Sequence, residues 1–205
     1  MADAGPLADT GPLVAVLAAG AASRFGGGKL DADLAGKPVG QWVVDAVAAA
    51  GLAPGLIVVS PQVTRFAAAS GWPLLTNIRP SDGLGTSLAL AASAALGQGR
   101  ALLVVLADMP LVSPRHLAEL AANRCAATLY PDGKAGVPAL VDLAMLPALA
   151  ELTGGEGAGP LLAARSDLVR VPAPPAMLLD IDRPADLARA AELAAPTPQG
   201  NYRGV

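Results

Sequence analysis

Short apolar runs alternate with longer segments rich in Ala and Leu along most of the chain. Because parallel strands buried on both faces are apolar throughout, the runs predict strands. They lie at Leu13–Ala18, Leu56–Ser60, Leu74–Thr76, Ala101–Ala107, Ala126–Tyr130, Gly136–Val141 and Met177–Leu179. Apolar positions at helical spacing predict helices between them: one opened by Pro38 and stopped by Gly51, a short one through Phe66, and others at Thr86–Leu96, from Pro114, near Ala144–Leu152 and Gly157–Arg165, and at Pro184–Ala194.

Strands that alternate with helices of this length need crossover connections, which predicts an α/β domain with a mostly parallel sheet covered on both faces. We place this single domain at residues 13–195, between a loose N-terminal leader at 1–12 and a C-terminal tail at 196–205. In such sheets ligands bind at the carboxyl ends of the strands, beside a switch point in the strand order. The polar residues that follow the strands are therefore the candidates for function.

Composition narrows the class of protein. The 205 residues carry a net charge of −3 and only 15% are charged, so no nucleic-acid partner is expected. Apolar runs are short or broken by Pro and Gly, so no membrane span is expected either. The N-terminus lacks the positive segment of a secretory signal, and the single cysteine, Cys125, cannot form an internal disulfide. We expect a cytoplasmic protein, with Cys125 in the core and the one histidine, His116, at the surface or in the first turn of a helix.

A glycine-rich segment from Gly20 to Gly28 follows the first predicted strand. Glycines let successive backbone N–H groups turn inward around an anion, and Arg24 and Lys29 add two full charges. Lysine is scarce, yet two of the three in the chain, Lys29 and Lys37, lie in or near this segment. The segment matches neither the Walker A loop nor the dinucleotide fingerprint, which disfavours a dehydrogenase. It predicts a phosphate-binding loop; the alternative is a surface loop with incidental charges.

Three aspartates stand near strand ends. Asp108 follows the most apolar predicted strand, where a carboxylate is costly to bury unless it is paired or holds a cation. One or two carboxylates, with substrate phosphates and water, are a common set of Mg²⁺ ligands. Asp180 and Asp182 point the same way in an extended segment, so either could join Asp108 around one ion. The alternatives are a turn role for Asp108 and a helix cap for Asp182.

A polar loop from Asn77 to Ser87 leads into a predicted helix. A helix N-terminus at this position would favour an anionic ligand. Simple capping by Ser81, Thr86 or Ser87 is the alternative.

These segments, taken in order, resemble the MobA-like NTP transferases, and within that family the molybdenum cofactor cytidylyltransferase branch. The resemblance spans about Leu13 to Leu193 and implies a single-domain, Rossmann-like, three-layer α/β/α fold of the nucleotide-diphospho-sugar transferase type. The matching stretches are Leu17-Ala-Ala-Gly…Ser23-Arg-Phe-Gly…Lys29, Asn77…Gly83-Leu-Gly-Thr-Ser-Leu88, Ala107-Asp-Met-Pro-Leu111 and Leu179-Asp-Ile-Asp-Arg-Pro-Ala-Asp-Leu187.

The resemblance also implies a site. Lys29, Arg24 and Asp108 are expected to be catalytic, and Asp108 and Asp182 to hold Mg²⁺. The residues expected to bind the nucleotide are Leu17, Ala18, Ala19, Gly20, Ser23, Arg24, Lys29, Asn77, Gly83 and Ser87. The Ala-Ala-Gly sequence and the stretch from Gly83 are closer to relatives that use CTP than to those that use GTP.

The implied reaction is the Mg²⁺-dependent transfer of CMP from CTP to the molybdenum cofactor, a molybdopterin-type phosphate acceptor, with release of pyrophosphate. The implied protein partner is a molybdenum hydroxylase or its chaperone. The chain departs from the family at Gly136-Val137-Pro138, where the family often has His or Arg before the proline. One alternative is transfer from GTP or another NTP to a different acceptor, as in guanylyltransferases or enzymes acting on sugar 1-phosphates. The other is a non-catalytic protein that hands on a nucleotide or cofactor.

Overall fold

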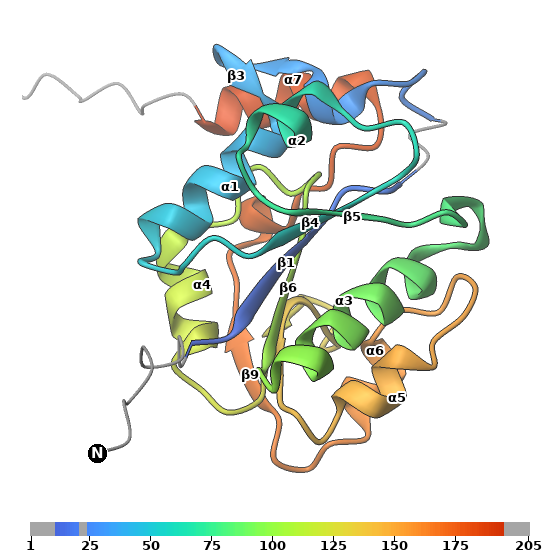
Figure 1. Ribbon diagram of the computed structural model, residues 1–205. Coiled ribbons are helices and arrows are strands. Elements are labelled where there is room, and N and C mark those ends of the chain that lie inside the picture. Colours follow the sequence, from blue (N-terminus) through green and yellow to red (C-terminus); the bar gives the residue numbers. More distant parts are fainter. Residues whose placement is uncertain (1–10, 21–23, 195–205) are drawn as a thin grey trace, which may run out of the picture.

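A seven-stranded sheet runs through the middle of the computed structural model, which describes residues 11–20 and 24–194 (Figure 1). Its strand order is β5-β4-β1-β6-β8-β7-β9. Among these strands only β8 runs against its neighbours, pairing antiparallel with β6 and β7. The mostly parallel sheet expected from the sequence is therefore confirmed. The bounds are β1 (Leu13–Leu17), β4 (Leu56–Val59), β5 (Leu74–Thr76), β6 (Leu102–Leu106), β7 (Ala126–Leu129), β8 (Ala135–Val141) and β9 (Val169–Pro172).

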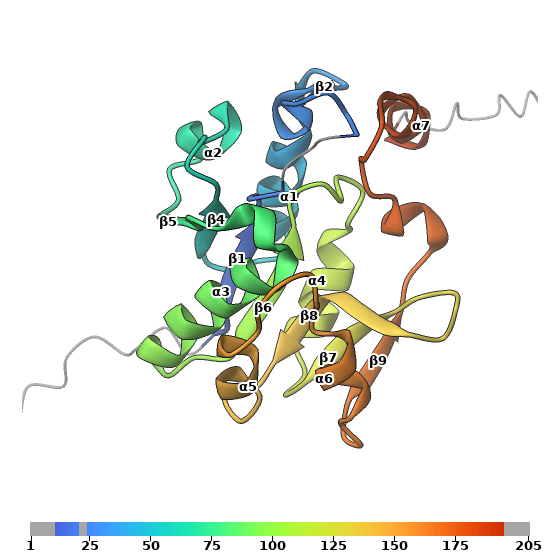
Figure 2. The same cartoon turned by 90° about the vertical axis from the view of Figure 1, so that its right-hand side faces the viewer.

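The helices form one layer on each face of the sheet. Residues of α1, α2, α4 and α7 share one hydrophobic cluster, and residues of α3, α5 and α6 share the other. Figure 1 shows α1 and α2 above the central strands and α3, α5 and α6 below them, and Figure 2 shows the same layers after a quarter turn. The bounds are α1 (Val39–Ala49), α2 (Arg65–Ala69), α3 (Leu84–Gln98), α4 (Pro114–Ala121), α5 (Leu146–Ala150), α6 (Gly159–Ala163) and α7 (Pro184–Ala194).

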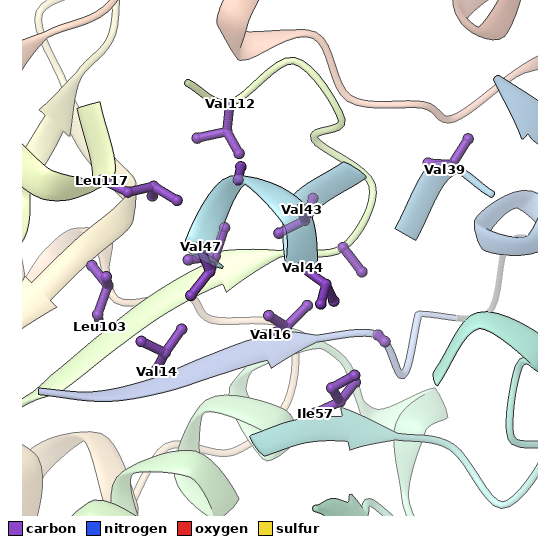
Figure 3. Close-up of a cluster of buried hydrophobic side chains, with 14 of the residues drawn as sticks. Val14, Val16, Val39, Val43, Val44, Val47, Ile57, Leu103, Val112 and Leu117 are labelled. Atoms are coloured by element: carbon purple, nitrogen blue, oxygen red, sulfur yellow. The ribbon is translucent and has the colours of Figure 1, made fainter. Parts of the chain in front are cut away.

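Strand β1 is central because all five of its residues are apolar and buried. Val14 and Val16 point into the layer of α1, where they lie near Val43 and Val47 (Figure 3). The other three residues point into the layer of α3. Since β1 pairs parallel with β4 and β6, the carboxyl ends of these three strands meet at one edge of the sheet.

The prediction of the last strand was wrong. Met177 and Leu178 belong to a 3-10 helix, η3 (Pro175–Leu178), and the last strand is β9 instead. Two successive prolines begin η3, and proline has no N–H to donate to a strand ladder. Strand β9 was missed because it is a sheet edge that pairs with β7 alone and has three exposed residues in four. A short antiparallel pair, β2 (Asp33–Leu34) and β3 (Lys37–Pro38), was also missed.

His116 lies in the first turn of α4 but is buried, with 5% of its surface exposed. Its Nε2 lies 2.8 Å from Thr128 Oγ1 on β7, and burial lowers the pKa of the imidazole. Of the two places expected for His116, the first turn of a helix is confirmed and the surface was wrong, because a hydrogen-bonding partner lies under the helix. Cys125 is in the core, as expected. In the described part of the chain, no helix combines the length and the apolar character needed to cross a membrane.

Candidate functional site

The glycine-rich loop and Asp108 lie next to each other because they follow paired strands. Leu17 at the end of β1 is paired with Leu106 at the end of β6. The pairing continues one step further, since the N–H of Ala107 donates to the carbonyl of Leu17 at 3.0 Å. The next polar residue on the β6 side is Asp108. The sheet therefore brings the two sequence motifs to the same edge.

Three successive glycines shape the second half of the loop. Gly26, Gly27 and Gly28 have φ values of 87°, 97° and 64°, a region that side chains with a Cβ rarely adopt. They turn the chain into a 3-10 helix, η1 (Lys29–Asp31). Asp31 then accepts hydrogen bonds from the N–H groups of Arg65 and Phe66 at 2.9 and 2.8 Å. This bond pair anchors the end of the loop to the start of α2.

Lys29 joins the loop to two carboxylates from distant parts of the chain. Its side chain is buried, and Nζ donates to Asp108 Oδ2 at 2.7 Å and to Asp182 Oδ1 at 3.0 Å. Burial alone would lower the pKa of Lys29, but the charges and hydrogen bonds of Asp108 and Asp182 outweigh it, so the pKa is raised. The ammonium therefore stays charged and bridges the two carboxylates beside the glycine loop.

The segment that carries Asp182 is fixed by backbone hydrogen bonds. The N–H of Ile181 donates to the carbonyl of Asp108 at 2.9 Å, and the Ile181 side chain is fully buried. Asp186 Oδ2 accepts from the N–H groups of Asp182 and Arg183 at 3.0 and 2.7 Å, which is how an acidic residue in the first turn caps a helix. Asp186, and not Asp182, therefore caps α7, and the Asp182 carboxylate is left to face Lys29.

Arg24 and Asp180 lie at the open side of this cluster. Arg24 is largely exposed, with Nη1 3.7 Å from Asp182 Oδ2. Loss of hydration, followed by the negative charges of Asp108 and Asp182, raises the pKa of Asp180 to about 6. Asp182 is thus the member of the pair that contacts Lys29, while Asp180 lies within the electrostatic field of the same carboxylates.

The donor set fits a small hard cation. Because one ammonium bonds both Asp108 and Asp182 at 2.7 and 3.0 Å, the two bonded oxygens lie within about 6 Å of each other, close enough to converge on one ion. The described residues contain no group of three His, Cys, Asp or Glu side chains placed to hold a metal. An ion on Asp108 and Asp182 would therefore take its other ligands from phosphates and water, as Mg²⁺ commonly does.

The loop that begins at Asn77 is held by its own side chains. Asn77 is buried, and its Nδ2 donates to Thr86 Oγ1 at 2.8 Å and to Ser87 Oγ at 3.0 Å. Its Oδ1 accepts from the N–H of Arg79 at 2.9 Å. The Asn77 amide is thus engaged at each of its polar atoms and shapes the loop. Thr86 donates to the carbonyl of Gly83 at 2.8 Å, close to the start of α3.

Two cavities border the glycine loop. The larger, about 540 Å³, lies between the loop and the segment that follows β4. The smaller, about 320 Å³, lies between β1, β6 and the start of α3, with Asp108 in its wall. Its lining is Leu17, Ala19, Gly20, Pro80, Gly83, Leu84, Ser87, Leu106 and Asp108. The two cavities lie next to each other along the loop, since Ala19, Gly20 and Pro80 line both.

The structure thus brings most of the predicted site residues together. Lys29, Asp108 and Asp182 are in contact, and Ala18 and Lys29 line the larger cavity. Ser23 lies outside the described residues. Sequence analysis missed the anchoring roles of Asp31 and Asp186. For Asp186 a signal was present, because it is an acidic residue in the first turn after Pro184. No local signal linked Asp31 to α2.

Comparisons with known proteins identify the family and the fold. A family model described as MobA-like NTP transferase domain matches residues 14–170. Among solved structures, Rv0371c from Mycobacterium tuberculosis H37Rv is 22% identical, with 88% of this chain and 98% of that chain covered and a TM-score of 0.69. A nucleotidyl transferase from Methanothermobacter thermautotrophicus is 24% identical, with coverage of 90% and 97% and a TM-score of 0.72. A manganese complex of Rv0371c is 22% identical, with coverage of 89% and 99% and a TM-score of 0.68. None of the curated proteins matches the chain.

Proposed function

The chain belongs to the MobA-like NTP transferase family, and from this premise we propose that it transfers CMP from CTP to the phosphate of a molybdopterin-type acceptor. Nucleotidyl transfer follows from the family. The base, the acceptor and the metal are the parts that we propose. The observation that carries the proposal is the contact of Lys29 with both Asp108 and Asp182 beside the glycine loop.

In the proposed reaction an oxygen of the acceptor phosphate attacks the α-phosphorus of CTP in line. A new P–O bond joins the acceptor to CMP, the bond between the α- and β-phosphates breaks, and pyrophosphate leaves with that electron pair. Both substrates are anionic, so charge neutralisation and alignment are the main requirements. No side chain needs to act as a general base, because the attacking phosphate oxygen already carries negative charge.

Each residue at the sheet edge has a role in this scheme. The N–H groups of the glycine loop and the charges of Lys29 and Arg24 bind the phosphates and stabilise the departing pyrophosphate. Asp108 and Asp182 would hold Mg²⁺, which when bound supplies positive charge to the α-phosphate. The related fold of Rv0371c has been solved as a complex with manganese, which supports the use of a divalent ion.

The lining of the smaller cavity favours a nucleotide base that carries hydrogen-bond acceptors on the edge of its ring. Ser87 Oγ accepts from Asn77 Nδ2, so its hydroxyl proton is available to be donated into the cavity that Ser87 lines. Cytosine presents two such acceptors, O2 and N3. This geometry adds to the resemblance of the Ala18-Ala19-Gly20 and Gly83 stretches to enzymes that use CTP.

The proposal is tested by measuring pyrophosphate release with each of the four NTPs and Mg²⁺, against the molybdenum cofactor and a panel of sugar 1-phosphates. We expect release with CTP and the molybdenum cofactor, and loss of release in Asp108→Asn. Glu119→Gln, the same chemical change on an exposed position of α4, serves as the control and should behave as the wild type. Release only with GTP, or only with a sugar 1-phosphate, would overturn the specificity; tight CTP binding with no release would favour a carrier.

A further inference from the structure

The two neighbours of β6 bring different segments to the edge of the sheet that carries Asp108. Strand β1, with the glycine loop, lies on one side of β6, and β8 lies on the other. Because β8 is antiparallel to β6 and β7, it begins at the edge where those strands end (Figure 2). The β7–β8 connection therefore lies on the opposite side of Asp108 from the nucleotide loops.

A β-bulge marks the start of β8. The pairing register shifts between Ala127 and Thr128, leaving Val137 and Pro138 without opposite residues. Their carbonyl groups accept from side chains instead: Tyr130 Oη donates to Val137 at 2.7 Å, and Thr128 Oγ1 donates to Pro138 at 2.7 Å. Bulges of this kind often re-aim side chains near active sites. Here the bulge fixes the orientation of the Tyr130 ring.

The Tyr130 ring packs on Gly136, where a Cβ atom would lie only 2.9 Å from ring atom Cε2. The residue is half-buried, so the ring is braced on the strand while part of the side chain stays accessible. Burial, and then the charges of Asp180 and Asp108, raise the pKa of Tyr130 to about 12. The phenol thus keeps its proton at neutral pH and keeps its hydrogen bond to Val137.

Tyr130 differs in this position from the other aromatic residues that the structure describes. Phe25, Trp42, Phe66 and Trp72 belong to, or pack against, the hydrophobic cluster on the α1 face of the sheet. The cavity assigned to the base lies on the β1 and α3 side. Tyr130 follows the carboxyl end of β7, so it lies at the same edge of the sheet as Asp108, on the side of β6 away from the glycine loop.

We propose that Tyr130 binds the acceptor, with its ring forming a flat wall beside Asp108 on which a planar heterocycle carrying a phosphate stacks. The inference rests on the proposed transfer reaction and extends it to the acceptor side. An aromatic ring held in one orientation loses little conformational freedom when a second ring stacks on it. Gly136 is needed at its position because any side chain there would displace the wall.

The test compares Tyr130→Leu with Tyr130→Phe, which keeps the ring, and with Thr128→Val, which removes the other hydroxyl of the bulge. Steady-state pyrophosphate release gives separate KM values for the molybdenum cofactor and for CTP. We expect Tyr130→Leu to raise the acceptor KM by about tenfold or more, the scale of one lost ring stack, with the KM for CTP changed by less than about threefold. Tyr130→Phe should keep the acceptor KM of the wild type. Thr128→Val should lower thermal stability without raising the acceptor KM.

A binding measurement separates this inference from the proposed reaction. Fluorescence anisotropy of 6-hydroxymethylpterin monophosphate, a planar phosphorylated probe, is titrated with each variant in the absence of CTP. If the probe binds to wild type and Tyr130→Phe but not to Tyr130→Leu, and the wild type releases no pyrophosphate in the steady-state assay, the proposed reaction is contradicted while the role of Tyr130 in acceptor binding is supported. Equal binding by all variants, no binding by the wild type, or an equal loss in Thr128→Val would overturn the role of Tyr130.

Discussion

Lys29→Met removes the charge that joins the two carboxylates while keeping a long side chain of similar volume. In the structure the Lys29 ammonium is buried between Asp108 and Asp182. Without it, two negative charges within about 6 Å repel each other by about 3 kcal/mol at an effective dielectric constant of about 20. The two carboxylates of the variant should therefore attract a cation more strongly. The variant also lacks one of the positive charges assigned to the triphosphate.

These two effects predict opposite changes in two assays. Removing one preorganised charge from a phosphoryl-transfer site should lower kcat by about 100- to 1000-fold. Binding of Mn²⁺ in the absence of nucleotide should become tighter, by up to about 100-fold if the whole repulsion is relieved. Steady-state pyrophosphate release measures the first change, and electron paramagnetic resonance of free Mn²⁺ measures the second.

The control is Lys37→Met, which breaks the ion pair with Asp45 on the α1 side of the molecule and should alter neither quantity. Near-normal turnover in Lys29→Met would refute the assignment of Lys29 to the phosphates. Unchanged or weaker Mn²⁺ binding would refute the view that Asp108 and Asp182 form a cation site that Lys29 occupies.

Three further predictions concern residues that stabilise the fold around the sheet edge and its loops. Because the pKa of His116 is lowered in the folded state, the unfolded chain binds the proton more readily. As the pH is lowered from 6.5, the free energy of unfolding should therefore decrease, by at most about 1.4 kcal/mol per pH unit. Urea denaturation should show a smaller decrease in His116→Gln. Asp186→Ala leaves two N–H groups without their acceptor and should lower stability by about 1 kcal/mol in the same assay, whereas an unchanged midpoint would contradict its capping role. Gly83→Ala places a Cβ 2.6 Å from the Gly154 carbonyl oxygen at a φ of 113°. We therefore expect the free energy of unfolding to fall by more than about 1 kcal/mol and the KM for CTP to rise. Wild-type values for both would show that this close contact does not constrain the loop before α3.

Much of the architecture could be predicted because the pattern of buried residues is local and strong. The five apolar residues of β1, the helix from Pro184 and the strand before Asp108 are each visible as a short run in the sequence. Residues placed at the ends of such runs must come to one edge of a parallel sheet. By this rule the glycine loop that carries Lys29 and the turn that carries Asp108 are expected at the same edge.

Long-range contacts of single polar groups could not be predicted. Asp31 anchors the glycine loop to α2, and the burial of His116 depends on Thr128 beneath its helix. The hydrogen bonds of the Asn77 amide to Thr86 and Ser87 were likewise not visible in the sequence. Each of these outcomes depends on which hydrogen-bonding group lies opposite after folding, and periodicity carries no such information.

We propose that Asp108 and Asp182 hold one divalent ion beside the bound nucleotide. The most direct test is an anomalous difference map from crystals grown with Mn²⁺ and a CTP analogue whose α–β bridge cannot be cleaved. We predict a single Mn²⁺ peak bonded to oxygens of both Asp108 and Asp182 and to the α-phosphate, with Lys29 turned to the phosphates. A nucleotide complex whose Mn²⁺ contacts neither carboxylate would contradict it.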